Sequence, residues 1–334
     1  MSRRLRVALA LSGPALRDAL FSPGLRRRIA AVADCDLDTV VTDFATTALD
    51  LDAVEVLLTG WGCPRIDAAA LARLPRLELV AHAGGTVKGH VDPVCWDRGI
   101  AVTTAASANA VPVAEFTLAQ ILLAGKATLR ASALYVSRQA RVERDDLPRV
   151  GNYDRTVGII GASTVGRLVL ERLRAVDVSV VLADPTITAD EAADLGATLL
   201  GLDQLMAASD IVSLHAPVLP GTLGMIGAAQ LAALPDGATF INTARGGLVD
   251  HEALRAEVAT GRISAVLDVT DPEPLEPGDV LYRLPNVLLT PHIAGAMGTE
   301  LYRLTALAVA EIEQLAAGDP FHHPVSRADL EQMA

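Results

Sequence analysis

Three side chains between residues 242 and 292 could together carry out acid–base chemistry on a small anion. Arg245 stands in NTARGG, Glu273 in DPEPLEPGD and His292 in LLTPHIAG. A guanidinium can hold a carboxylate and a neighbouring carbonyl oxygen in a fork. A carboxylate bonded to one imidazole nitrogen fixes the tautomer and favours the charged ring, so that the other nitrogen can deliver a proton near neutral pH. We therefore take Arg245, Glu273 and His292 as the catalytic candidates, with Arg245 also binding the substrate.

Their surroundings separate these residues from ordinary side chains. A lone arginine, histidine or loop acid is usually a solvated or packed residue. Two glycines follow Arg245, however, and they let the backbone pass close to a ligand. His292 follows a strand-like run, and Glu273 comes from the loop after the preceding one. The histidines that we interpret as surface or core residues are His82, His90, His251, His322 and His323.

A glycine-rich turn predicts a dinucleotide cofactor. In TVGIIGASTVG the residues Gly161 to Gly166 follow a strand and open a helix. The first glycine permits a tight turn, the last permits close packing, and the middle position lets the backbone approach a pyrophosphate at the helix N-terminus. Ser163 occupies that middle position. Without further support, the same pattern would suit any strand–turn–helix.

Asp184 supports the cofactor interpretation, because it ends the next strand. A carboxylate there can accept hydrogen bonds from the adenine ribose and repels a 2′-phosphate. No arginine stands beside Pro185 to hold such a phosphate. The sequence therefore predicts NAD, with NADH preferred over NADPH, and no metal. The predicted cofactor-binding residues are Gly161, Ser163, Thr164, Val165, Gly166, Asp184, His215, Ala216, Pro217, Thr243, Ala244, Arg245, Asp268, His292 and Gly295.

The composition of the chain and its alternating strand-like and helix-like segments favour an α/β fold. A chain of 334 residues suits two domains, and 51% hydrophobic but only 3% aromatic residues suit parallel strands covered by alanine-rich helices. The expected strands are Leu5–Leu11, Thr39–Val41, Val54–Thr59, Leu77–Ala81, Ala101–Thr103, Val157–Ile160, Ser179–Ala183, Ile211–Leu214, Thr239–Asn242, Ala265–Val269 and Val287–Leu289. Helical patterns between them predict two Rossmann-like, doubly wound parallel sheets.

Charge and cysteine usage narrow the partners. A net charge of −12 disfavours nucleic acid and anionic membranes as partners. Cys35, Cys63 and Cys95 are odd in number and far apart, which indicates a reducing, cytoplasmic compartment without a disulfide framework or zinc cluster. The N-terminal apolar run is too brief for a signal peptide, so we interpret it as the first strand. We expect no apolar stretch to reach the length of a membrane span.

These motifs give the chain a resemblance to the D-isomer-specific 2-hydroxyacid dehydrogenases over nearly its whole length. The matching stretches are RGIAVTTAASANAVPVAEFTL, TVGIIGASTVG, DIVSLHAPVLPGTLGMIG, FINTARGGLVDHEAL, LDVTDPEPL and NVLLTPHIAG, of which the last four are specific to the family. The resemblance implies a substrate domain over residues 1–108 and 297–334, with an NAD domain over 109–296 inserted into it. It places the active site in the cleft between the two domains.

The resemblance also implies roles for individual residues. Arg245 would bind the substrate carboxylate and carbonyl, and Glu273 would orient and charge His292, the acid/base. Asp268 and Thr243 would contact the nicotinamide half.

Two further expectations come from the resemblance. Backbone amides around Gly85, Thr86 and Val87 would form a carboxylate-binding loop, although AGGTVKGHVD departs from the usual pattern. A homodimer would form through the cofactor domain, using a segment from about Ala124 to Tyr153.

The leading hypothesis is an NAD-dependent enzyme that interconverts a small 2-keto acid and a D-2-hydroxy acid. An NADH-sensing, corepressor-like binding protein of the same fold is the alternative from another class. A formate dehydrogenase is a third, disfavoured by Glu273 because that family resembles this chain but carries glutamine as the histidine partner. Trp61, His82 and Lys88 indicate either an unusual substrate or packing variation, and we favour packing.

Overall fold

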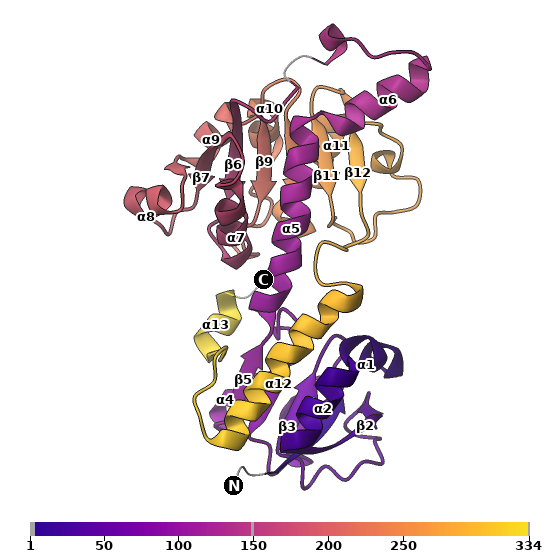
Figure 1. Cartoon of the computed structure of the whole chain (residues 1–334), viewed down its shortest axis with the longest axis vertical. Coiled ribbons are helices and arrows are strands. Elements are labelled where there is room, and N and C mark those ends of the chain that lie inside the picture. The colour runs from indigo at the N-terminus through magenta and orange to yellow at the C-terminus, as the bar shows by residue number, and fades with distance from the viewer. Residues whose placement is uncertain (1–3, 148–149, 333–334) are drawn as a thin grey trace. The chain divides into compact units, whose positions relative to one another are not determined.

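Two parallel sheets organise the chain, one in each of two units. The computed structural model describes residues 4–147 and 150–332. One unit, the discontinuous unit, joins the residues up to Ala110 to those from Ala296 onward, and the other, the central unit, covers Val111–Gly295 (Figure 1). Pro148 and Arg149, within the segment expected to form a dimer contact, lie outside the described residues, as do the first three residues and the last two.

The discontinuous unit is a five-stranded parallel sheet in the order β2-β1-β3-β4-β5. Its strands are β1 (Leu5–Ala10), β2 (Ala33–Val41), β3 (Val56–Thr59), β4 (Leu79–His82) and β5 (Ala101–Thr104). Its helices are α1 (Pro14–Leu20), α2 (Pro23–Val32), α3 (Ala68–Ala72), α4 (Val94–Asp97), α12 (Leu301–Ala317) and α13 (Arg327–Gln332), with a 3₁₀ turn η4 (Gly298–Glu300). The returning helix α12 lies beside α2 (Figure 1), and together with α1 they bury one face of the sheet. Residues of α3 and α4 contribute to the core on the other face.

The central unit is a seven-stranded parallel sheet in the order β12-β11-β10-β9-β6-β7-β8. Its strands are β6 (Arg155–Ile160), β7 (Val178–Ala183), β8 (Thr198–Leu199), β9 (Ile211–Leu214), β10 (Thr239–Asn242), β11 (Ser264–Leu267) and β12 (Val287–Leu289). Most of α5 (Ala106–Gly125) lies in this unit. The other helices of the unit are α6 (Thr128–Arg138), α7 (Thr164–Leu173), α8 (Ala189–Asp194), α9 (Leu202–Ala208), α10 (Ala228–Ala233) and α11 (His251–Ala259), with 3₁₀ turns η1 (Arg144–Asp146), η2 (Gly246–Leu248) and η3 (Val280–Tyr282).

Successive side chains of the central strands serve two separate cores. Phe240 packs with α9, α10 and α11, whereas the next residue, Ile241, packs with α5, α7 and α8. This alternation follows from the two-residue period of a strand, and it leaves the sheet apolar on both faces. The strand order reverses beside β6, which makes the end of β6 the switch point where open α/β sheets bind ligands. The predicted fold class, two doubly wound parallel α/β units, is confirmed.

Helix α5 corrects one expectation. It has 20 residues and a mean hydropathy of 1.3 over its most apolar stretch, so it is long and apolar enough to cross a membrane, contrary to the sequence analysis. Half of that stretch is buried, and Ala114 and Ile121 pack into the core of the central unit. A helix that covers a buried parallel sheet needs the same composition, and this packing accounts for it.

Candidate functional site

The turn after β6 has no room for side chains at two of its glycines. Gly161 has a φ of +96°, and a Cβ on it would lie 2.8 Å from the backbone nitrogen of Ala216. A Cβ on Gly166 would lie 2.0 Å from the carbonyl oxygen of Gly161. Any larger residue at either position would push apart β6, α7 and the end of β9. The tight turn at the switch point therefore depends on glycine at both ends.

Ser163 caps helix α7. Its Oγ accepts a hydrogen bond from the backbone nitrogen of Gly166 at 3.3 Å. Serine is among the residues preferred at this position, where a cap stabilises a helix by about 1 kcal/mol relative to alanine. A hydroxyl also carries one donor of its own, so the same group can donate to an anion at the helix N-terminus.

Asp184 is tied to the glycine turn. Its carboxylate accepts hydrogen bonds from the backbone nitrogen of Ala162 at 2.6 Å and from the nitrogen and hydroxyl of Thr186 at 2.8 and 2.6 Å. Burial acts to raise the pKa of Asp184, but these hydrogen bonds and the charge of Arg167 outweigh it and lower the pKa. The group is therefore ionised at neutral pH.

Arg167 is a neighbour of Asp184 that the sequence did not reveal, because it belongs to the preceding helix, α7, and not to the residues beside Pro185. It comes from α7, and its Nε donates to the carbonyl oxygen of Ala162 at 2.9 Å. Its charge also lowers the pKa of Glu191. This cation is therefore close enough to Asp184 and Glu191 for its charge to act on both carboxylates.

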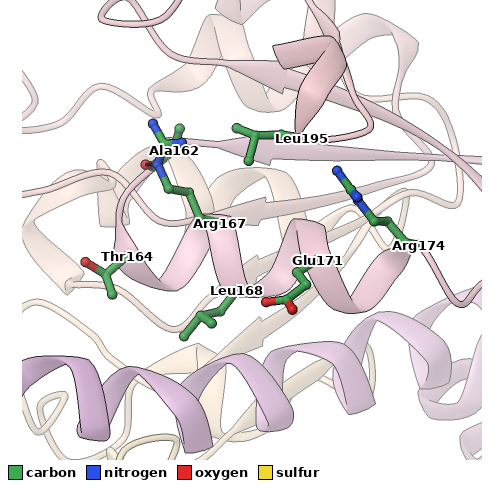
Figure 2. Close-up of a pocket in the computed structure, with 7 residues that line it drawn as sticks. All are labelled: Ala162, Thr164, Arg167, Leu168, Glu171, Arg174 and Leu195. Carbon is green, nitrogen blue, oxygen red and sulfur yellow. Dashed lines mark hydrogen bonds between the residues drawn. The ribbon is translucent and has the colours of Figure 1, made fainter. Parts of the chain in front are cut away.

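An open hollow of about 690 Å³ begins at the glycine turn and follows α7. It is lined by Ala162, Thr164, Arg167, Leu168, Glu171, Arg174 and Leu195 (Figure 2). None of Arg245, Glu273 and His292 lines it. It therefore adds space beside the turn without reaching the acid–base residues.

Glu273 and His292 form a hydrogen-bonded pair. The imidazole Nδ1 lies 2.7 Å from the Oε1 of Glu273, and the two side chains are 47% and 41% exposed. With Nδ1–H donating to the carboxylate, Nε2 is the nitrogen left for proton exchange with another molecule. The pair is thus accessible and has a defined tautomer.

Arg245 belongs to the same edge of the sheet. The side chain of Asn242 closes the turn after β10, donating to the carbonyl oxygen of Arg245 and accepting from the backbone nitrogen of Ala244, both at 2.9 Å. Burial lowers the pKa of Arg245, and the charge of Glu273 opposes this shift. A guanidinium nevertheless stays charged in proteins. The structure thus brings Arg245 close enough to Glu273 for their charges to interact.

Asp268 holds the loop that carries His292. Its carboxylate is almost fully buried and accepts from the hydroxyl of Thr290 at 2.6 Å and from the backbone nitrogens of Ile293 and Ala294, both at 2.9 Å. Its own carbonyl oxygen accepts from the backbone nitrogen of His292 at 2.9 Å. These bonds join Asp268, which directly follows β11, to the loop after β12, so Asp268 fixes the backbone from which the imidazole of His292 projects.

The other predicted cofactor residues are spread along the same edge. His215 is buried and bonded to the hydroxyl of Ser213 at 2.9 Å, and burial lowers its pKa to about 3. The hydroxyl of Thr243 bonds that of Thr117 at 2.9 Å. The remaining ones are Thr164 and Val165 in the first turn of α7, Ala216 and Pro217 after β9, Ala244 after β10, and Gly295 at the end of the central unit.

The predicted carboxylate loop lies in the discontinuous unit, after β4. Gly85 and Thr86 are half-buried, but the side chain of Val87 is fully buried in the core. His82 is buried beneath the loop: its Nδ1 bonds the hydroxyl of Thr59 at 2.9 Å, and a Cβ on Gly84 would lie 2.5 Å from its Nε2. Burial lowers the pKa of His82 to about 3. His82 therefore packs under the loop as a neutral ring.

Comparison with known proteins places this site in context. Residues 118–294 match the family model for the D-isomer specific 2-hydroxyacid dehydrogenase, NAD binding domain. The chain is 34% identical to the (S)-sulfolactate dehydrogenase of Chromohalobacter salexigens, over 85% of this chain and 94% of that protein. It is 30% identical to the D-3-phosphoglycerate dehydrogenase of Archaeoglobus fulgidus, over 80% of this chain. The chain spans about half the length of the phosphoglycerate dehydrogenases it matches, 50% in that case.

A solved structure extends the likeness to almost the whole chain. The NADPH-dependent glyoxylate/hydroxypyruvate reductase of Sinorhizobium meliloti, crystallised with citrate, is 25% identical with a TM-score of 0.74. The match covers 99% of both chains.

The bonds of Asp268 lead to a stability prediction. Asp268→Asn keeps the shape but turns one acceptor into an NH₂ group that faces a donor, so one buried polar group loses its partner. We expect the free energy of unfolding to fall by about 1–3 kcal/mol. Urea denaturation measures this, with Asp236→Asn at an exposed position as the control, expected to change by about 0.5 kcal/mol or less. Equal stability of the two variants would contradict the anchoring role.

Proposed function

Because the chain belongs to the D-isomer specific 2-hydroxyacid dehydrogenase family, we propose that it interconverts a small 2-keto acid and the corresponding D-2-hydroxy acid with NAD. The observation that carries the proposal is the 2.7 Å contact between Nδ1 of His292 and Oε1 of Glu273, with Arg245 in electrostatic reach of the same carboxylate. These are the acid–base and anion-binding groups that the reaction needs.

The residues of the central unit fit a dinucleotide. Gly161 and Gly166 keep the turn free of side chains, and the N-terminus of α7 presents backbone amides capped by Ser163. The ionised Asp184 at the end of β7 can accept bonds from ribose hydroxyls. NADH, when bound, supplies the hydride that the keto carbon receives.

The side chains of this protein then handle the charge and the proton. Arg245 holds the substrate carboxylate and stabilises the negative charge that develops on the keto oxygen. His292 donates a proton from Nε2 to that oxygen, and in the opposite direction it removes the hydroxyl proton. Glu273 orients the ring through Nδ1 and stabilises its charged form.

The names of the relatives support the substrate class. They act on sulfolactate, 3-phosphoglycerate, and glyoxylate or hydroxypyruvate, according to their names. Each of these is a small 2-hydroxy or 2-keto acid. We extend that class, without choosing a member of it, to this chain.

We further propose a homodimer through the segment from about Ala124 to Tyr153. Large apolar side chains are exposed in this segment, at Tyr135 and Val136 on α6 and at Tyr153 before β6. Large apolar side chains that are left exposed are common at protein–protein contacts.

The function is tested by following NADH oxidation with glyoxylate, hydroxypyruvate, pyruvate, and larger or branched 2-keto acids. With the best of these, His292→Ala should lower kcat by about a hundredfold or more, because the positioned acid is lost. His322→Ala, at an exposed histidine of the other unit, is the control. Near wild-type rates in His292→Ala would refute its role. NADH binding by the wild type without turnover of any keto acid would instead favour a corepressor-like binding protein.

The charges around Asp184 predict a preference for NADH. We expect kcat/KM with NADH to exceed that with NADPH by at least about tenfold, since an ionised carboxylate repels the 2′-phosphate. Asp184→Ala should narrow the ratio of kcat/KM with NADH to that with NADPH, because only Glu191 then opposes the charge of Arg167, which can attract the phosphate. Asp177→Ala is the matched control, because Asp177 is an exposed carboxylate directly before β7, the strand that Asp184 follows. A wild-type enzyme that uses NADPH equally well would contradict the prediction.

Removing only the charge of Glu273 tests its part in the pair. Glu273→Gln keeps an acceptor for Nδ1–H but replaces a charged hydrogen bond with a neutral one, a difference of about 1.4 kcal/mol. We expect kcat for hydroxy-acid oxidation, in which His292 takes up a proton and becomes charged, to fall about tenfold on that basis, with little change in KM. The variant and the wild type are compared at saturating NAD. An unchanged kcat, or a change confined to KM, would show that Glu273 does not act through His292.

A further inference from the structure

The loop that carries Glu273 is held by the connection that carries Arg245. This connection runs from Arg245, after β10, to His251, the first residue of α11. A Cβ on Gly246 would lie 2.0 Å from the carbonyl oxygen of Thr270, so the two backbones pass each other without room for a side chain. One end of the Glu273 loop is thereby docked next to Arg245.

His251 makes the second contact with that loop. Its side chain is buried, and its Nε2 accepts a hydrogen bond from the backbone nitrogen of Asp271 at 3.2 Å. Its Nδ1 lies 3.1 Å from the carbonyl oxygen of Val249. A backbone N–H can only donate, so Nε2 must be the unprotonated nitrogen and Nδ1 must carry the hydrogen. Both ring nitrogens are therefore engaged, and Asp271 is two residues from Glu273.

From these contacts we propose that His251 is a positioning residue for the reaction, which sets the place of the Glu273 carboxylate against His292 by holding the backbone of Asp271. The proposal rests on the proposed function. Sequence reasoning treated His251 as an ordinary histidine, because the partner that gives it a role comes from a different loop. The same short connection thus supplies the substrate-binding arginine at one end and the support for the acid–base pair at the other.

The charges around His251 keep its ring in the form that this role needs. Burial has the largest effect and lowers the pKa of His251, and the charge of Arg255 lowers it further. The hydrogen bond to Val249 and the carboxylates of Asp271 and Asp279 act in the opposite direction without reversing the shift. The ring is therefore neutral at pH 7, and Nε2 remains an acceptor.

Two substitutions separate positioning from simple packing. The side-chain oxygen of glutamine reaches about as far as Nε2, so His251→Gln can still accept from the Asp271 nitrogen. The amide of asparagine reaches only as far as Nδ1, so His251→Asn keeps a donor for Val249 but offers nothing to Asp271. Both variants replace an imidazole by an uncharged amide, and they differ in which of the two hydrogen bonds survives.

The kinetic test uses the full chain and its best 2-keto acid. His251→Asn should lower kcat about tenfold or more, with KM changed by less than about threefold, because Glu273 is displaced from its working geometry. His251→Gln should keep kcat within about threefold of the wild type. Equal kcat values for the two variants, whether both high or both low, would overturn the proposal.

A second measurement does not depend on turnover. Hydrogen–deuterium exchange of the peptide covering Val269–Leu275 should be faster in His251→Asn than in the wild type and His251→Gln, since the Asp271 N–H has lost its acceptor. Unchanged exchange in His251→Asn would overturn the proposal even if the enzyme is active. The two proposals can fail separately. If exchange is faster only in His251→Asn and the wild type turns over no keto acid, the loop contact is supported and the proposed function has failed.

Discussion

The buried carboxylate of Asp268 is the interaction on which the arrangement of the site depends. It gathers the hydroxyl of Thr290 and the backbone nitrogens of Ile293 and Ala294, and so closes the loop around His292. His292 has a φ of +54°, a left-handed conformation that costs a residue with a side chain roughly 1–2 kcal/mol. Charge-assisted bonds to a buried carboxylate are strong enough to offset that cost. Without these bonds the left-handed backbone at His292 loses its support, and with it the position of the imidazole beside Glu273.

The sequence predicted which residues make up the candidate site, but it did not predict the hydrogen bonds that hold their loops in place. Parallel strands β10, β11 and β12 pair in register, so residues just beyond their ends meet at one edge. This geometry is why Arg245, Glu273 and His292 could be proposed together from motifs alone. The anchoring by Asp268 and the contact made by His251 involve hydrogen bonds between loops distant in sequence, and no periodicity encodes such pairs.

The fold followed from the sequence wherever strands are buried on both faces, because continuous apolar runs mark them. Two strand segments that are not buried on both faces were not predicted. The first six of the nine residues of β2 read ADCDLD, and the charged positions are exposed at the edge of the sheet, so the run lacks the apolar character of a central strand. Strand β8 has two residues, Thr198 and Leu199, and sits at the other sheet's edge. A segment that short carries too few positions for any pattern.

Ser163 shows how a departure from a motif can be consistent with its physics. Its backbone, at φ −63° and ψ 176°, is ordinary extended conformation, so glycine is not needed there for the turn itself. The conformational demand falls instead on Gly161, at φ +96°, and the packing demand on Gly166. The middle position must leave the helix N-terminus accessible to a ligand. Serine adds a Cβ there, but its hydroxyl also caps the helix. The cap fixes the first turn of α7, and a rigid first turn keeps its free amides aimed at one point. The crowding introduced by the side chain is thus set against a better-ordered set of donors for a pyrophosphate.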